Sequence, residues 1–318
     1  MIKIALDIMG GDNAPHSNID GAIDFLNENH SSVKLYLVGD KKLITSHIAS
    51  KFGNYNNNDF EIVHTTEIIT SKDIPSKIIK LKPDSSMNKS ICLLRDNIVD
   101  CVISSGNTGC LVSSSFFNLG MIDGVKRPGL FTVIPSENGN FLLGDVGANS
   151  NCKPNQLLQY SKMATTYCKH LLNIKNPRVA LLNIGSEQNK GTELLKETHM
   201  LMNESLDNFI GNIESRYIFN SQADVVICDG FTGNIVLKLI EGMMAYNLNL
   251  IANKFNLKTS EEIRNLKSLY DYEQYGATPI LGINGLVLKS HGSSSKISIL
   301  NALKIAKKLS NIDLINKF

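Results

Sequence analysis

Short apolar runs, each ended by glycine and small polar residues, recur along the chain and constrain its fold more than any other feature. They are IKIAL at 2, VKLYLV at 33, FEIV at 60, DCVIS at 100, FTVI at 131, FLL at 141, RVALLNI at 178, DVVIC at 224 and GLVLK at 285. Many are rich in valine and isoleucine without clean alternation, as expected for strands buried on both faces of a largely parallel sheet. Segments with helical periodicity, such as 154–172 after Pro154, separate several of them. The sequence therefore predicts an α/β fold with helices on both faces of the sheet.

Length and charge narrow the class further. The chain has 318 residues, enough for one large α/β unit or two fused lobes, and no linker is visible, so we predict a single domain over 1–318. With 32 basic against 30 acidic residues, the formal charge of +2 is too balanced for a nucleic acid as main partner. The first apolar run is interrupted by Asp7, and no stretch approaches the roughly 18 uninterrupted apolar residues of a membrane span. We predict a cytoplasmic protein.

Several well-known motifs are missing. Six cysteines occur without a C-x-x-C pair, which favours reduced core residues over metal ligands or disulfides. Neither H-E-x-x-H, G-x-S-x-G nor G-x-G-x-x-G occurs. In GSEQNKGT the order Lys190-Gly191 is transposed relative to a P-loop. We predict no metal, no nucleotide and no other cofactor.

Six predicted strands end in loops that combine glycine with asparagine, aspartate, serine or threonine. These loops are residues 7–13, 104–109, 144–149, 185–192, 229–234 and 291–295. The carboxyl ends of parallel strands share one edge of a sheet, where ligands bind. N–H groups at helix N-termini favour anions, above all phosphate. The loops therefore predict an anion site, although about half of the glycines could serve tight turns alone.

The same loops carry a family resemblance. DIMGGDNAP, SSGNTG, GDVGAN followed by KP, LLNIGSEQNKG, FIGNIE, DGFTGN and HGSS occur in this order over most of the chain. Together they resemble the bacterial phosphate acyltransferase family PlsX. The resemblance implies a three-layer α/β/α fold related to phosphotransacetylases and isopropylmalate-dehydrogenase-like proteins. It also implies transfer of an acyl group from acyl-[acyl carrier protein] to inorganic phosphate in phospholipid biosynthesis, usually by a homodimer.

Three residues are our candidates for catalysis. Lys190 would place charge on phosphate, Asn234 would donate its amide to phosphate or to the oxyanion, and His291 would donate a proton. We expect Lys190 and Asn234 each to lie at the start of a helix. The structural alternatives to catalysis are a solvated lysine for Lys190, a helix cap for Asn234 and a hydrogen-bonded structural histidine for His291. The predicted substrate-binding residues, of which Asp145 and Asp229 are expected to orient loops or lysines, are Gly10, Gly11, Asp12, Ser104, Gly106, Asn107, Thr108, Asp145, Asn149, Asn183, Gly185, Glu187, Gly191, Asp229, Gly230, Thr232 and Gly233.

Two other functions and one surface stay open. The chain could be a phosphotransacetylase-type enzyme that uses acyl-CoA, or a non-catalytic scaffold that docks acyl carrier protein at the membrane. Helices over about 235–275 carry apolar residues at helical spacing, including Met243, Met244 and Phe255. They would serve either dimer packing or peripheral contact with the inner face of the membrane. A glycerol-3-phosphate acyltransferase would follow in the same pathway.

Overall fold

The computed structural model describes residues 1–29, 32–53, 59–255, 260–261, 263, 266 and 272–312. The chain forms two compact units, which are described separately. Unit 1 is Met1–Gly124 with Tyr272–Lys317, and unit 2 is Val125–Asp271. Unit 1 is thus completed by the C-terminal part of the chain. Whether the two act as the one domain predicted over 1–318 stays a prediction.

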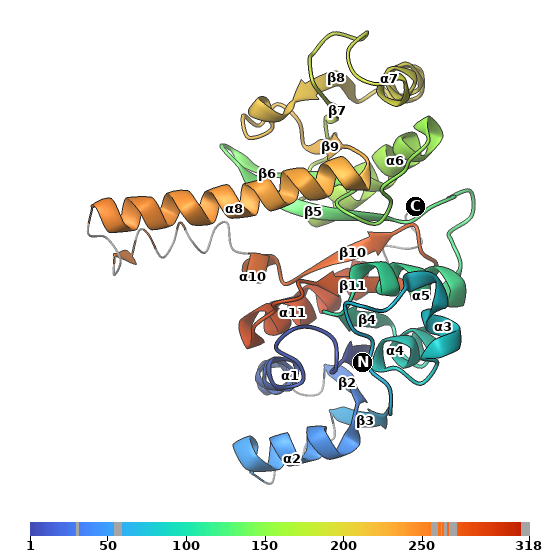
Figure 1. The fold of residues 1–318 in the computed structure, drawn as a ribbon, viewed down its shortest axis with the longest axis vertical. Helices are drawn as coiled ribbons and strands as arrows, with labels where there is room; N and C mark the ends of the chain where they lie inside the picture. The colour runs from blue at the N-terminus through green and yellow to red at the C-terminus, as the bar shows by residue number, and fades with distance from the viewer. Residues whose placement is uncertain are drawn as a thin grey trace. The chain divides into compact units, whose positions relative to one another are not determined.

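Unit 1 contains a six-stranded, mostly parallel sheet in the order β3-β2-β1-β4-β11-β10 (Figure 1). Its strands are β1 (Ile2–Asp7), β2 (Val33–Gly39), β3 (Phe60–His64), β4 (Cys101–Ser104), β10 (Ala277–Leu281) and β11 (Leu286–Ser290). Only β10 runs antiparallel to its neighbour β11 within this sheet. Its helices are α1 (His16–Glu28), α2 (Lys41–Phe52), η1 (Pro75–Lys77), α3 (Ile78–Leu81), α4 (Ser86–Arg95), α5 (Thr108–Leu119), α10 (Tyr272–Tyr275) and α11 (Lys296–Ile312). The pair α1 and α11 covers one face and the pair α4 and α5 the other, which gives the predicted three layers.

Unit 2 contains the strands in the order β5-β6-β9-β7-β8. They are β5 (Gly129–Ser136), β6 (Gly139–Gly144), β7 (Val179–Asn183), β8 (Phe209–Glu214) and β9 (Val225–Ile227). The hairpin of β5 and β6 is antiparallel, and the other pairs are parallel. The helical elements are α6 (Pro154–Leu171), α7 (Glu193–Ser205), η2 (Ser215–Tyr217) and α8 (Gly230–Lys254). All nine predicted runs form strands; β8 and β10 were not among them.

Burial explains the apolar runs. In β4, β7 and β9 every residue is buried, because helices cover both faces of the sheet. A central strand in such a sandwich tolerates no polar alternation. The predicted helix at 154–172 is α6, with Leu157, Ser161 and Ala164 on its buried face as expected.

Helix α8 differs from the others. Over the described ranges it is the one helix long and apolar enough to cross a membrane by length and composition, and 11% of that window is buried. Its exposed large apolar residues follow helical spacing and include Phe231, Ile235, Leu239, Met243, Tyr246 and Leu250. The stretch after Phe255 lies largely outside the described residues, so the expectation for 235–275 is tested there only in part.

Candidate functional site

In unit 1 a buried carboxylate joins two of the predicted loops. Because β1 and β4 are parallel neighbours, Asp7 and Ser104 lie together at their carboxyl ends. Ser104 Oγ donates to Asp7 Oδ2 at 2.6 Å and accepts from Gly106 N at 3.1 Å. Met9 N donates to Asp7 Oδ1 at 3.2 Å. Burial raises the pKa of Asp7, and the Ser104 hydrogen bond partly offsets this.

The third loop of unit 1 joins the same cluster. Asp12 N donates to Gly292 O at 2.7 Å, and Asn13 Nδ2 to Ser293 O at 3.0 Å. His291 is held locally, since its Nδ1 lies 2.8 Å from Ser293 Oγ and accepts from Ser293 N at 3.3 Å. The loop at 7–13 therefore contacts both the loop at 104–109 and the loop at 291–295, as predicted from the strand ends.

Glycine is needed in this cluster because the backbones approach closely. A Cβ on Gly10 would lie 2.6 Å from Asp7 Oδ2 and 2.8 Å from Gly106 N. Gly11 has φ +104°, a conformation that other residues rarely adopt. Gly10 and Gly11 therefore determine the shape of the loop. This is the structural role that the sequence leaves open for the glycines of these loops.

Asn107 caps helix α5, and Thr108 is its first residue. The Asn107 side chain accepts from Cys110 N at 3.1 Å, and its Nδ2 lies 3.5 Å from the carbonyls of Thr70 and Ser71. Asn107 therefore acts as the helix cap, and its amide oxygen is already engaged.

Three residues of this cluster were not predicted. Asn18 Nδ2 donates to the carbonyls of Asp7, Ile8 and Gly10, and so fixes the first loop. Ser105 Oγ is buried with no hydrogen-bond partner in the described structure. Lys289 Nζ donates to Ser105 O at 3.4 Å, which adds a cation to this edge. A lysine after an apolar run could have indicated the last of these; the others depend on long-range contacts.

In unit 2 a second buried carboxylate organises the loop after β6. Asp145 Oδ1 accepts from the backbone N–H of Leu130 (3.2 Å), Gly147 (3.0 Å) and Ala148 (2.8 Å), and Oδ2 from that of Asn149 (2.8 Å). Burial raises the pKa of Asp145. Asn149 Nδ2 in turn donates to Tyr160 Oη at 2.8 Å. Asp145 and Asn149 therefore hold the loop, and the carboxylate of Asp145 faces backbone donors.

Helix α8 begins against this loop. Gly230 N donates to Asn149 O at 2.8 Å, and a Cβ on Gly230 would lie 2.7 Å from that oxygen. Gly233 leaves no room for a Cβ, which would meet the backbone oxygen of Asp145. The Asn234 side chain lies 3.9 Å from the position that a Cβ on Gly147 would take. The motifs GDVGAN and DGFTGN are thus packed together, and the glycines permit it.

The first N–H groups of α8 are already hydrogen-bonded. Asp229 Oδ1 accepts from Phe231 N and Thr232 N, both at 3.0 Å, and its Oδ2 accepts from Thr232 Oγ1 at 2.8 Å. Gly233 N donates to Asp229 O. An anion at this helix start would therefore meet side chains, such as the Asn234 amide, and the expectation of available backbone donors is wrong here.

Lys190 lies in the loop after β7. The expectation that it begins a helix is wrong, because α7 begins at Glu193 with Thr192 in the N-cap position. Asn183 Nδ2 donates to Lys190 O at 3.1 Å, and the ammonium lies 3.8 Å from Glu187 Oε1 with its side chain 48% exposed. Gly185 packs against both side chains, and Gly191 has φ +88°. No hydrogen bond between described residues joins this loop to 144–149 or 229–234, although β7 and β9 are parallel neighbours.

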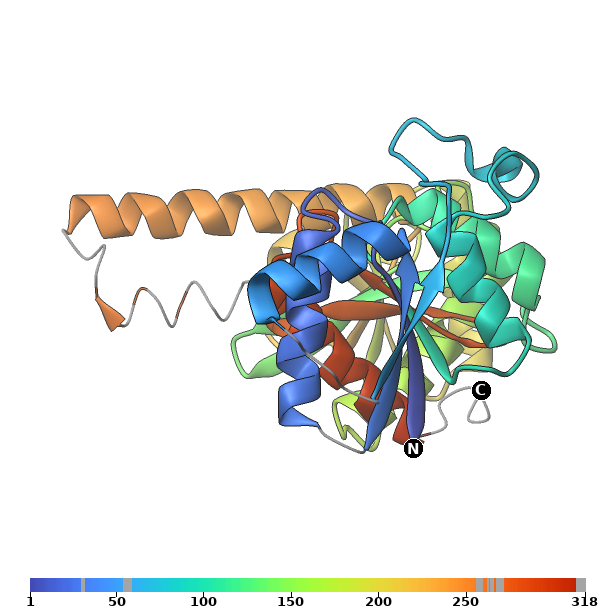
Figure 2. The ribbon, with the colours of Figure 1, turned by 90° about the horizontal axis from the view of Figure 1, so that it is seen from below.

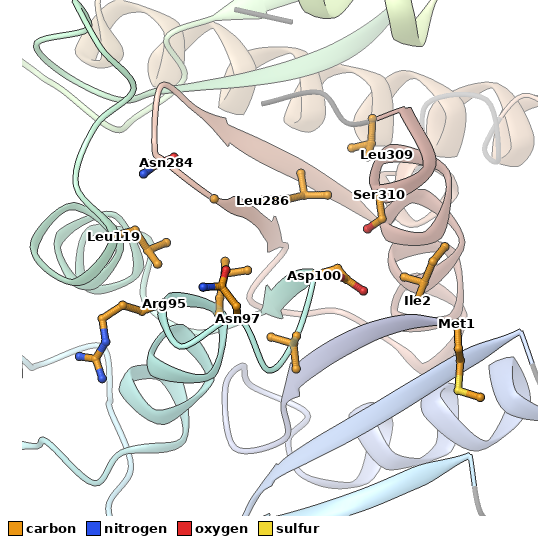
Figure 3. Close-up of a pocket in the computed structure, with 13 residues that line it drawn as sticks. Met1, Ile2, Arg95, Asn97, Asp100, Leu119, Asn284, Leu286, Leu309 and Ser310 are labelled. Atoms are coloured by element: carbon orange, nitrogen blue, oxygen red, sulfur yellow. The ribbon is translucent and has the colours of Figure 1, made fainter. Parts of the chain in front are cut away.

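A pocket of about 770 Å³ lies at the opposite edge of unit 1 (Figure 3). Met1, Ile2, Val99 and Asp100 line it at the amino ends of β1 and β4, together with Arg95. None of the predicted site residues lines it. The polar clusters at the carboxyl ends of the strands are the better candidate site.

Comparisons with known proteins agree with this fold. The sequence profile of the fatty acid synthesis protein family matches residues 2–317. A phosphate acyltransferase from Clostridioides difficile is 42% identical, with 100% of this chain and 96% of the relative covered. One from Halothermothrix orenii is also 42% identical, covering 98% and 95%.

Solved structures place the fold among phosphotransacetylases. The enzyme from Streptococcus pyogenes superposes with a TM-score of 0.65 at 14% identity, covering 98% of this chain and 94% of that one. A phosphotransacetylase from Staphylococcus aureus gives 0.59 at 14% identity, covering 97% and 94%. At such identities the likeness concerns the fold alone, whereas the sequence matches cover the full length. The chain is therefore an acyltransferase enzyme of fatty acid and phospholipid synthesis, and it belongs to the phosphate acyltransferase family.

Proposed function

We propose that this enzyme transfers an acyl group from acyl-[acyl carrier protein] to inorganic phosphate. The full-length similarity to phosphate acyltransferases carries the proposal. A phosphate oxygen attacks the thioester carbonyl carbon, and the tetrahedral oxyanion collapses with loss of the pantetheine thiolate. The products are acyl phosphate and the free carrier thiol. That thiol has a pKa of roughly 8.5, as for cysteine, so its thiolate leaves with little acid assistance.

Positioning and charge supply the acceleration in this proposal. Phosphate and the thioester must be held in attack geometry, and the oxyanion needs donors fixed in advance. Asn234 suits this role because the loop 145–149, locked by Asp145, supports the start of its helix. Lys190 suits phosphate because its contact with Glu187, at 3.8 Å, is loose enough to be exchanged for a dianion.

His291 would supply the proton for the departing thiolate. Its Nδ1 accepts the N–H of Ser293, so the neutral ring carries its proton on Nε2. An Nε2–H donor can protonate a thiolate and recover its proton from solvent.

The test is incubation of the purified protein with palmitoyl-acyl carrier protein and phosphate, with free carrier measured over time. Lys190→Ala and Asn234→Ala should each lose at least about 90% of the activity while staying folded, and the lysine variant should need more phosphate. Lys196→Ala is the matched control, because Lys196 also lies 3.8 Å from a glutamate three residues away, on α7. Full activity in both site variants, with unchanged phosphate dependence, would contradict the assignment.

The likeness to phosphotransacetylases keeps one alternative in view, an enzyme that uses acyl-CoA. Turnover of palmitoyl-CoA at a kcat/KM equal to or above that of the carrier thioester would favour it. Binding of the carrier without any turnover would favour a non-catalytic scaffold.

For α8 we propose packing against a second copy of the chain in a homodimer. The exposed stripe from Phe231 to Leu250 is long and apolar, as such interfaces require. Tyr246→Glu, within the stripe, should shift sedimentation to the monomer. We further propose that the cytoplasmic enzyme delivers its product to a glycerol-3-phosphate acyltransferase at the membrane. Phe255→Glu, just past the end of the helix, should then reduce salt-sensitive binding to anionic vesicles and leave the dimer intact. If Phe255→Glu leaves vesicle binding unchanged, the membrane role is wrong.

A further inference from the structure

The segment between β3 and α4 carries a basic and apolar surface, which we name the lysine patch. It consists of Lys72, Lys77, Lys80, Ile74 and Leu81, all exposed. Ile74 is 54% and Leu81 67% exposed. In Figure 2 the segment, coloured cyan, stands out from the sheet of unit 1.

The acidic residues of this segment are half-buried and hydrogen-bonded within it. Glu67 Oε2 accepts from Asp84 N at 2.8 Å, and Asp84 Oδ2 accepts from Thr66 N at 2.9 Å. Asp73 Oδ2 accepts from Thr70 N and from Lys82 Nζ, both at 2.7 Å.

The patch lysines, in contrast, are uncompensated. Lys72, Lys77 and Lys80 form no ion pair with any described residue. The local acids accept hydrogen bonds within the fold, so this short segment combines two exposed apolar side chains and three exposed lysines without an ion pair in the described part of the chain.

The segment is fixed beside the candidate site of unit 1. Ser113 Oγ, on α5, donates to Pro75 O at 2.8 Å. A Cβ on Gly109 would lie 2.9 Å from Pro75 Cγ. The Asn107 side chain reaches the carbonyls of Thr70 and Ser71. The lysine patch is therefore supported by the same loop, 104–109, that is predicted to bind substrate.

We propose that the lysine patch is the docking surface for the acidic carrier protein that delivers the acyl thioester. This rests on the proposed function. Exposed apolar side chains together with charged ones are typical of protein interfaces, and a small interface suits a partner that must leave after each turnover. Complementary charge would speed the encounter and fix the orientation of the carrier. An anionic membrane would match the charge, but it would have no need of a rigid link to loop 104–109.

The test compares two triple variants. The first is Lys72→Glu, Lys77→Glu, Lys80→Glu. The matched control is Lys162→Glu, Lys169→Glu, Lys175→Glu, which makes the same change of charge at exposed lysines of unit 2. The patch triple should raise the KM for palmitoyl-acyl carrier protein by roughly ten-fold or more at low salt, with the difference shrinking as salt rises. Its kcat, its KM for phosphate and its turnover of palmitoyl-pantetheine should stay within about two-fold of the wild type. Leu81→Asp should also raise the KM for palmitoyl-acyl carrier protein, although it changes a single charge and leaves the three lysines in place.

The outcomes separate docking from function. Equal effects of the two triples on the carrier KM would overturn the proposal. Loss of anionic-vesicle binding in the patch triple, with an unchanged carrier KM, would assign the surface to the membrane and also overturn it. If the wild type transfers no acyl group, the proposed function fails, and direct binding of the carrier protein then decides the docking. Binding that is lost only in the patch triple supports it, and no binding by the wild type refutes it.

Discussion

Asp7 in unit 1 and Asp145 in unit 2 occupy similar positions in their sheets, but their carboxylates accept hydrogen bonds from different kinds of donor. Both stand at the carboxyl end of a strand, both are buried, and in both burial raises the pKa. Asp7 accepts from the hydroxyl of Ser104, which belongs to a neighbouring strand end. Asp145 accepts from four backbone N–H groups, three of them in its own loop. The first carboxylate links two loops, while the second fixes the backbone of one loop on which α8 then rests.

The comparison predicts that replacing the carboxylate with an amide destabilises the protein more at Asp145 than at Asp7. In Asp145→Asn the new NH₂ must face an N–H whichever way it is placed, because Oδ1 accepts from three backbone N–H groups and Oδ2 from the backbone N–H and the side-chain amide of Asn149. We expect a loss of about 3 kcal/mol in the free energy of unfolding, measured with urea. In Asp7→Asn the NH₂ can face Ser104 Oγ, since a hydroxyl accepts as well as donates, and the loss should be about 1 kcal/mol. An Asp7→Asn loss as large as that of Asp145→Asn would break the comparison.

The second prediction concerns the contact between the loop 145–149 and the start of α8. Gly233→Ala drives a methyl group into the backbone oxygen of Asp145, so loop and helix must separate. We expect a loss of about 2 kcal/mol and a fall in activity, because Asn234 moves with the helix.

Gly242→Ala, in the same helix, is the matched control. Its Cβ meets nothing within 4 Å, and alanine in a helix interior should gain about 0.5–1 kcal/mol. If Gly233→Ala were as harmless as Gly242→Ala, the contact between the loop and α8 would be unimportant.

The sequence predicted the strands and the loops better than the roles inside them. Apolar runs and glycine-rich ends depend on local pattern, and all nine runs formed strands. The pairing of Asp7 with Ser104 joins residues 97 positions apart, and no local pattern signals it. The same holds for β10 and β11, which return from the C-terminal part of the chain to complete unit 1.

Two helix starts carry local signals that bear on the anion site. Thr192 before Glu193 is an N-cap pattern, which places the start of α7 after Lys190. Asp229 before Gly230 is another, and it indicates that the first N–H groups of α8 are capped. A short polar side chain at the N-cap therefore competes with an anion for the same backbone donors, and at α8 the side chain holds them.

The last and smallest predicted effect is that the stability contributed by Asp73 and the stability contributed by Asp7 change in opposite directions with pH. Hydrogen bonds from Lys82 and Thr70 lower the pKa of Asp73 to about 2, the opposite of the shift at Asp7. Asp73 therefore contributes stability that is present above its unfolded pKa of about 3.9 and lost as pH falls through about 2. Asp7 contributes stability that is present below the unfolded pKa and lost as pH rises through its native pKa.

Urea unfolding from pH 7 to pH 3 should separate the two carboxylates. The cost of Asp73→Asn should shrink as the pH falls below about 4, and it should stay below about 1 kcal/mol because the ion pair is partly solvated. The cost of Asp7→Asn should grow over the same fall in pH, because the wild-type carboxyl regains its preferred protonated form. Parallel pH profiles for the two variants would contradict the opposite pKa shifts of Asp7 and Asp73.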